Sequence, residues 1–86
     1  SLGAATVSGL YDVTADAVVV TGAVGANSLD IDASGGAGTV TDSTGSLAVA
    51  TTTILAGGAG DNITLDAAGN DFGGVVTITS GNDVTL

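Results

Sequence analysis

Aspartate is the one residue type in this chain whose side chain could perform acid–base or metal chemistry near neutral pH. The 86 residues include nine carboxylates, all of them Asp, and no Lys, Arg, His or Cys, so the formal net charge is −9. Without an imidazole, a thiol or a side-chain amine, the chain has no ordinary general base and no thiolate nucleophile. Two possible uses of the carboxylates remain: binding of hard cations and acid–base pairing.

The best candidate for a cation site is the glycine-rich segment 57–65, Gly-Gly-Ala-Gly-Asp-Asn-Ile-Thr-Leu. It resembles the nonapeptide Gly-Gly-x-Gly-x-Asp-x-apolar-x of RTX β-rolls, in which carboxylate and turn carbonyl oxygens bind Ca²⁺. Asn62 stands where that pattern has Asp, Thr64 stands where it has a large apolar residue, and looser copies follow at 69–71 and 81–83. The calcium hypothesis assigns ligand roles to four residues: Asp61, Asn62, Asp71 and Asp83. The competing interpretation is that these side chains stabilise turns through hydrogen bonds to the backbone.

Asp30 and Asp32 are the best candidates for an acid–base pair. Alternate residues of a strand point to the same side and lie roughly 7 Å apart, a separation at which catalytic carboxylates occur. Nothing nearby in the sequence predicts a substrate cleft, and solvent-facing Asp between apolar residues explains the pattern. We therefore predict that the chain is not an enzyme.

The composition favours β-structure throughout. Thr, Val and Ile together supply 28 residues, Gly supplies 15, and Glu, Lys, Gln, Arg and Met are absent. The first group prefers strands, whereas the missing residues are those that populate helix surfaces. A positive mean hydropathy argues against disorder.

Apolar residues alternate with polar ones in short stretches, as expected for half-buried strands. The clearest predicted strands are 29–33, 47–49, 63–65, 76–78 and 84–86. Weaker patterns predict strands near 6–8, 12–14, 17–21, 39–41 and 52–55. The expected turns, with positive φ angles at Gly and Asn, are 22–27, 35–38, 57–62, 67–71 and 80–83.

Three features favour a solenoid over a sandwich. The phrase Gly-Asx-Asx-apolar-Thr-Leu occurs at 60–65 and again at 81–86, so a rung of about 20 residues would stack its two copies. Tyr11 and Phe72 are the only aromatic residues, and narrow coils prefer slim side chains. Alternation also continues if the end of the sequence is joined to its beginning. We predict one β-repeat segment, 1–86, of a parallel β-solenoid within a larger array or filament; the alternative is a small β-sandwich completed by a neighbouring strand.

The last third of the chain resembles a known family of repeats. Residues 68–86 contain Asn-Asp-Phe-Gly-Gly-Val-Val-Thr-Ile-Thr followed by Asn-Asp-Val-Thr-Leu. This segment is similar to repeats of large filamentous haemagglutinin-like adhesins, bacterial proteins that are secreted, often through a dedicated outer-membrane partner (two-partner secretion). The resemblance implies a right-handed parallel β-helix at the bacterial surface, with no catalytic residues in its shaft.

The uniform acidity limits the partners. Nucleic acids and anionic membranes are bound through Lys and Arg, which this chain lacks. We predict a structural repeat of an extracellular or cell-surface fibre or adhesin shaft that associates with itself through strand edges and needs no cofactor. An extracellular surface or receptor is a further expected partner. The alternative is a calcium-dependent RTX-like binding repeat.

Overall fold

Strands account for the regular structure of this chain. A computed structural model describes residues 1–42 and 44–86, and these stretches contain ten strands and no helix. The strands are β1 (Ala5–Thr14), β2 (Val18–Val19), β3 (Ala23–Asp32), β4 (Val40–Thr41), β5 (Ser46–Val49), β6 (Thr53–Ala56), β7 (Ile63–Thr64), β8 (Asp71–Phe72), β9 (Val76–Ser80) and β10 (Val84–Thr85). The predicted all-β class is confirmed. Within the described residues, no helix is long and apolar enough to cross a membrane.

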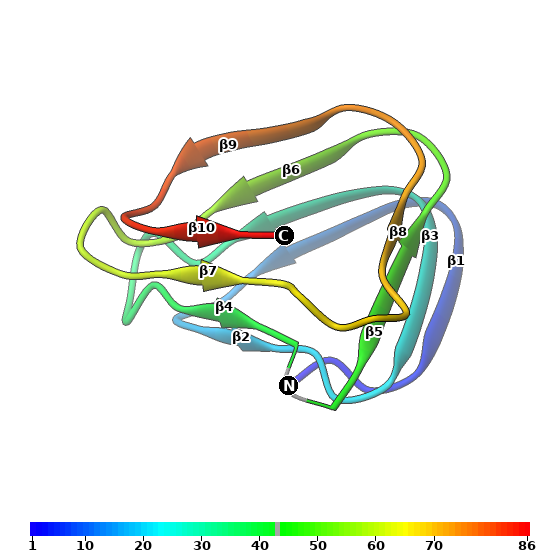
Figure 1. Cartoon of the computed structure of the whole chain (residues 1–86), viewed down its shortest axis with the longest axis horizontal. Helices are drawn as coiled ribbons and strands as arrows, with labels where there is room; N and C mark the ends of the chain where they lie inside the picture. The colour runs from blue at the N-terminus through cyan, green and yellow to red at the C-terminus, as the bar shows by residue number, and fades with distance from the viewer. Residues whose placement is uncertain (43) are drawn as a thin grey trace.

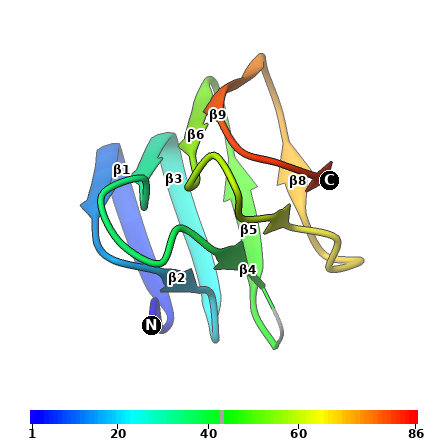
Figure 2. The same cartoon turned by 90° about the vertical axis from the view of Figure 1, so that its left-hand side faces the viewer.

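The strands form a parallel β-solenoid, as predicted. We number its coils by their strands: coil 1 is β1–β2, coil 2 is β3–β4, coil 3 is β5–β7 and coil 4 is β8–β10. Figure 1 looks along the solenoid axis from the coil 4 end, and Figure 2 shows the coils side by side. Every strand pair of the described residues is parallel and joins consecutive coils. The alternative of a β-sandwich is therefore wrong, because its sheets would pair antiparallel strands.

Each coil has three sides. The first side contains the initial parts of β1 and β3, together with β5 and β8. The second side contains the later parts of β1 and β3, together with β6 and β9. The third side is the four-stranded sheet β10-β7-β4-β2. One bent strand thus makes two sides in coils 1 and 2, whereas coils 3 and 4 use two strands (Figure 1).

Residues at equivalent positions of consecutive coils form columns through the stack. One column on the third side contains Val18, Val40, Ile63 and Val84, at steps of 22, 23 and 21 residues. These steps agree with the predicted rung of about 20 residues. The two copies of the turn phrase are stacked as expected, since Ile63 pairs with Val84 and Thr64 with Thr85.

The core consists of columns of slim side chains that point into the coil. Val18, Val40 and Ile63 are buried, and a column on the second side buries Ile31 and Leu55 completely. Alternation along each strand sends the neighbouring residues outward. The core is thus a stack of layers, each of which covers the next.

Three predicted turns overlap strands, and the turn predicted at 80–83 does so only at Ser80, which ends β9. Segment 22–27, expected to be a turn, forms the first part of β3 from Ala23 onward, and Asp71 begins β8. The predicted strands 6–8 and 12–14 are joined in β1. Gly and Ala give little local strand signal, but hydrogen bonds to the adjacent coils hold these segments extended.

Glycines at the corners act mainly by allowing close approach between coils. Positive φ angles were expected at many turns, but among the described residues only Gly38 and Gly81 have them. A Cβ on Gly38, where φ is +83°, would lie 2.5 Å from the backbone nitrogen of Gly58 in the next coil. A Cβ on Gly74 would meet the carbonyl oxygen of Thr51 even more closely. Corner glycines therefore let one coil lie directly on another.

Gly38→Ala should destabilise the chain strongly, because it adds both a strained backbone and a clash between coils. We expect a loss of at least about 2 kcal/mol in the free energy of unfolding. The matched control is Gly35→Ala in the same corner, where a Cβ would meet no atom within 4 Å. Chemical denaturation of both variants measures the difference, and equal stabilities would contradict the stacking of this corner.

Thr53 is a polar residue within an apolar column. It is 1% exposed, pairs with Leu29 and Val76 in the adjacent coils, and its Oγ1 has no hydrogen-bond partner among the described residues. A buried hydroxyl without a partner keeps its full desolvation cost.

Thr53→Val should therefore stabilise the chain, because it keeps the side-chain shape and removes the unpaired hydroxyl. We expect a gain of about 1 kcal/mol in the free energy of unfolding. Thermal or urea denaturation measures it, with Thr53→Ala as a control that should lose stability through the cavity it leaves. A destabilised Val variant would mean that this hydroxyl has a partner.

Candidate functional site

The structure brings together three of the four residues assigned to the calcium hypothesis. Asp61 and Asn62 end the corner that follows β6, and Asp83 lies above them in the corner before β10. Asp71 begins β8, on the opposite side of the coil (Figure 1). The four residues thus do not form one ligand set.

The amide of Asn62 links two coils. Its Oδ1 accepts the backbone N–H of Asp83 at 3.2 Å and the side-chain amide of Asn82 at 3.3 Å. The backbone carbonyl of Asp61 accepts the N–H of Asn82 at 2.8 Å. The bond from Asp83 is a side-chain to backbone hydrogen bond, as the competing interpretation expects, but it joins two coils and does not close a turn. Among the described residues, no group of three or more Asp, Glu, His or Cys side chains is placed to hold a metal ion, and calcium binding stays a prediction.

Asp30 and Asp32 lie on the outward side of β3, away from the core. Asp30 stacks directly on Asp12 of coil 1, and Asp32 stacks on Thr14. Like charges in adjacent strands repel one another. Among the described residues, the groups that the register and the hydrogen bonds place beside these two carboxylates are Asp12, Thr14 and the hydroxyl of Ser34.

Asp32 closes a small turn after β3. Its Oδ1 accepts the backbone N–H of Ser34 at 2.9 Å and the Ser34 hydroxyl at 2.5 Å. The hydrogen bond from the Ser34 hydroxyl has the larger effect, and the one from the backbone N–H adds to it. Both favour the charged form and lower the pKa of Asp32 below its ordinary value. Since folding lowers this pKa, the carboxylate stabilises the folded chain above the unfolded-state pKa. That contribution is lost as the pH falls through the folded-state pKa.

Ser34→Ala should raise the pKa of Asp32 toward its ordinary value, because it removes the hydroxyl donor. Carbon-detected NMR titration of the Asp32 carboxyl group measures this directly. Ser28→Ala, which leaves both hydrogen bonds in place, should leave the Asp32 titration unchanged. An unshifted Asp32 in Ser34→Ala would contradict this turn.

A buried polar cluster at the end of coil 2 was not predicted from the sequence. Asp42 is 4% exposed, and its Oδ2 accepts the N–H of Ala67 at 3.2 Å and the side-chain amide of Asn70. That amide also donates to the carbonyl of Leu65, and Asn70 Oδ1 accepts the N–H of Leu47. The sequence could have predicted the burial of Asp42 only if it had been aligned with itself at steps of about 22 residues. Such an alignment places Asp42 in a column of apolar residues. The cluster joins consecutive coils through hydrogen bonds.

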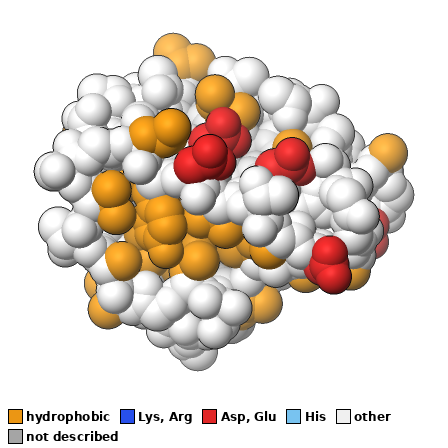
Figure 3. All heavy atoms as spheres, turned by 180° about the vertical axis from the view of Figure 1, so that it is seen from behind, with side chains coloured by type: hydrophobic (Ala, Val, Ile, Leu, Met, Phe, Trp, Pro, Cys, Tyr) orange, Lys and Arg blue, Asp and Glu red, His pale blue; other side chains and the backbone are white. Residues whose placement is uncertain are grey.

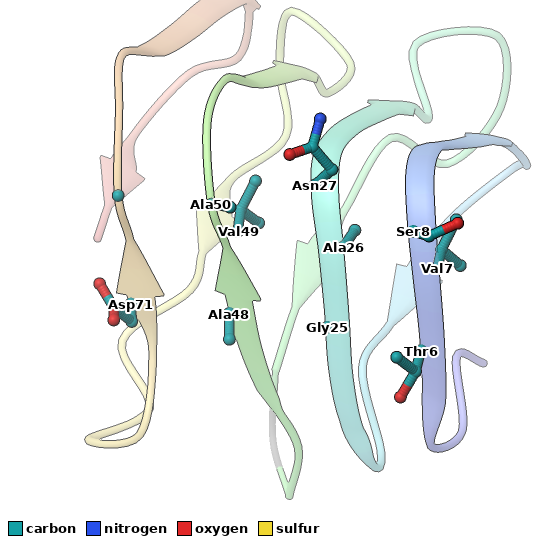
Figure 4. A pocket seen from close by; sticks show the side chains of 11 residues that line it. Thr6, Val7, Ser8, Gly25, Ala26, Asn27, Ala48, Val49, Ala50 and Asp71 are labelled. Atoms are coloured by element: carbon teal, nitrogen blue, oxygen red, sulfur yellow. The ribbon is translucent and has the colours of Figure 1, made fainter.

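A shallow groove of about 610 Å³ crosses the outer surface of the first side. Figure 4 shows its residues on four adjacent strands, with Thr6, Gly25, Ala48 and Asp71 in one row. The floor is formed by small residues, and Asp71 supplies the charge. A row of this kind offers a few hydrogen-bonding groups and no reactive pair.

The coil 1 end exposes part of the core. Figure 3 views this end, and apolar side chains gather near its centre. Leu2, Tyr11 and Val13 pack against the buried core but are themselves only partly buried. Within residues 1–42 and 44–86, no strand pairs with the outer edge of β1. Coil 1 therefore presents both apolar side chains and unpaired backbone groups.

The coil 4 end is open on all three sides. Phe72, Val76 and Ile78 are partly buried against coil 3, while Val84 is 38% and Leu86 53% exposed. No described strand covers β8, β9 or β10 from outside. Edges of this kind are templates for pairing with another strand. The two ends are the candidate functional surfaces of the chain.

Comparison with protein families finds a match over most of the chain. The model of a family described as "Repeats of unknown function (DUF5649)" matches residues 12–79. The chain belongs to this family. The matched DUF5649 segment runs from within β1 to within β9, so it spans stacked coils of the solenoid. No curated protein and no solved structure matches the chain.

Proposed function

We propose that this DUF5649 repeat is a structural unit of an extracellular fibre or adhesin shaft, which associates with itself through its strand edges. The observation that carries the proposal is the openness of both end coils. Each end offers unpaired edges together with half-buried core residues, whereas the same columns are closed in coils 2 and 3.

The interior of the coil argues for a structural role over a catalytic one. The core columns fill the coil with Val, Leu and Ile, and the side-chain amide of Asn62, one of the four candidate cation ligands, is engaged in a contact between corners. Repeat solenoids gain stability from interfaces between neighbours and need their terminal coils covered. The extracellular location is supported by the resemblance of residues 68–86 to haemagglutinin-like adhesin repeats.

Sedimentation velocity of the 86-residue chain tests the proposal. We expect large assemblies, growing with protein concentration, both in chelator and in millimolar Ca²⁺, because strand edges and apolar side chains drive the association. A monodisperse monomer at every concentration would overturn the proposal. Assembly that requires Ca²⁺ would favour the calcium-dependent repeat instead.

Val84→Lys should suppress assembly, since it places an ammonium group on the open face of coil 4. We expect the concentration for half-assembly to rise at least roughly tenfold, because burying an unpaired charge is costly. The matched control is Ile54→Lys. Ile54 is 37% exposed, close to the 38% of Val84, but it lies on the outward surface of β6 within the stack. Equal assembly of the two variants would mean that the ends are not the contact surfaces.

A further inference from the structure

The two ends of the solenoid match each other column by column. If the columns of the chain continue in register, coil 1 of a second copy falls on coil 4 of the first. Apolar residues then meet apolar residues on all three sides. The facing pairs, with the coil 4 residue first, are Phe72 and Val7, Val76 and Tyr11, Ile78 and Val13, and Val84 and Val18.

The same register keeps carboxylates apart. Asp71 of the first copy falls on Thr6 of the second, and Asp83 falls on Ala17. Asp12 of the second copy faces Thr77 of the first. A chain with nine carboxylates and no basic side chain has no cation of its own with which to neutralise facing Asp pairs. A register that places no Asp opposite another Asp at these positions is therefore favoured electrostatically.

Leu2 occupies the place that a preceding coil would take on the third side. Its N–H donates to the carbonyl of Val19 at 2.8 Å. The same bond joins Val20 to Thr41 and Leu65 to Thr85 in the coils that follow, also at 2.8 Å. Leu2 pairs with Val20, which is fully buried as a result of this cover. In a second copy stacked in register, the position above Val20 belongs to Leu86 of the first copy.

We propose that a second copy of this chain stacks head-to-tail on coil 4, in the register of the existing columns, and that Leu86 displaces the partner copy's Leu2 from Val20. This inference rests on the proposed function. It adds the direction in which the copies stack, the register of their columns, and Leu2 as the residue that competes with Leu86 for the same place. The contact is heterologous, so each added copy exposes a fresh coil 4 and the assembly grows as an open filament. The Leu2 contact covers part of the coil 1 end in every free chain and thereby opposes each association step.

Cysteine cross-linking tests the polarity and the register. The chain has no Cys, so the double variant Asp12→Cys, Thr77→Cys places one thiol on the outward surface of each end. Facing residues of adjacent strands lie about 4.8 Å apart, within the roughly 4.4–6.8 Å between Cα atoms that disulfides span. We expect oxidation to give a ladder of covalent multimers, resolved by denaturing electrophoresis without reductant.

Two controls make the result specific. In the double variant Thr14→Cys, Thr77→Cys, the thiols are two residues out of register and roughly 8 Å apart, so cross-linking should be weak. Each single variant should stay largely uncross-linked. Dimers from a single variant would overturn head-to-tail stacking, and efficient cross-linking of the out-of-register pair would overturn the register.

The competition between Leu2 and Leu86 predicts effects of opposite sign. Leu86→Gly should raise the concentration for half-assembly roughly tenfold, since it removes an apolar side chain from the contact. Leu2→Gly should lower that concentration, because it weakens the segment that must be displaced. Changes in the same direction would overturn the displacement.

These outcomes separate the two proposals. A chain that stays monomeric in sedimentation refutes the structural-repeat function itself. A chain that assembles but fails the cross-linking pattern retains that function and refutes head-to-tail register.

Discussion

Hydrogen bonding between consecutive coils is the interaction on which the rest of this structure depends. Most of its strands have two to five residues, too few to be stable alone, and each pairs with a segment about 22 residues away. Side-chain columns form because this pairing is parallel and in register. The corner glycines matter for the same reason: a Cβ at Gly38 would hold the next coil away. Layering, core and surface all follow from the stacking.

On the second side of the solenoid, burial depends on position along the stack more than on residue type. In the column of Val13, Ile31, Leu55 and Ile78, the two central residues are fully buried and the outer two are only partly so. Each layer is covered by the layers on its two sides. An end layer therefore keeps an apolar surface that a further layer could cover, and this links the fold to the proposed role in a fibre.

Polar residues inside the columns show how closely the register is specified. Asp42 is accommodated because Asn70 and the backbone of Ala67 lie opposite its carboxylate, whereas Thr53 has no such partner among the described residues. A shift of one residue between coils 2 and 3 would leave the Asp42 carboxylate buried without donors, which is costly. The cluster thus opposes slippage of neighbouring coils past each other.

The sequence by itself determined the class of structure: β-branched residues in short alternating runs predict strands, and the phrase repeated at 60–65 and 81–86 predicts their stacking, which the structure confirms. Tertiary structure alone decided that 23–27 is a strand, that Asp42 is buried and that Asp71 lies apart from Asp61, Asn62 and Asp83. It also decided which apolar residues are left at the open ends. The physical reason is that Gly and Ala carry little local preference. The hydrogen-bond partners that hold these segments lie about 22 residues away along the chain, beyond the reach of any local pattern.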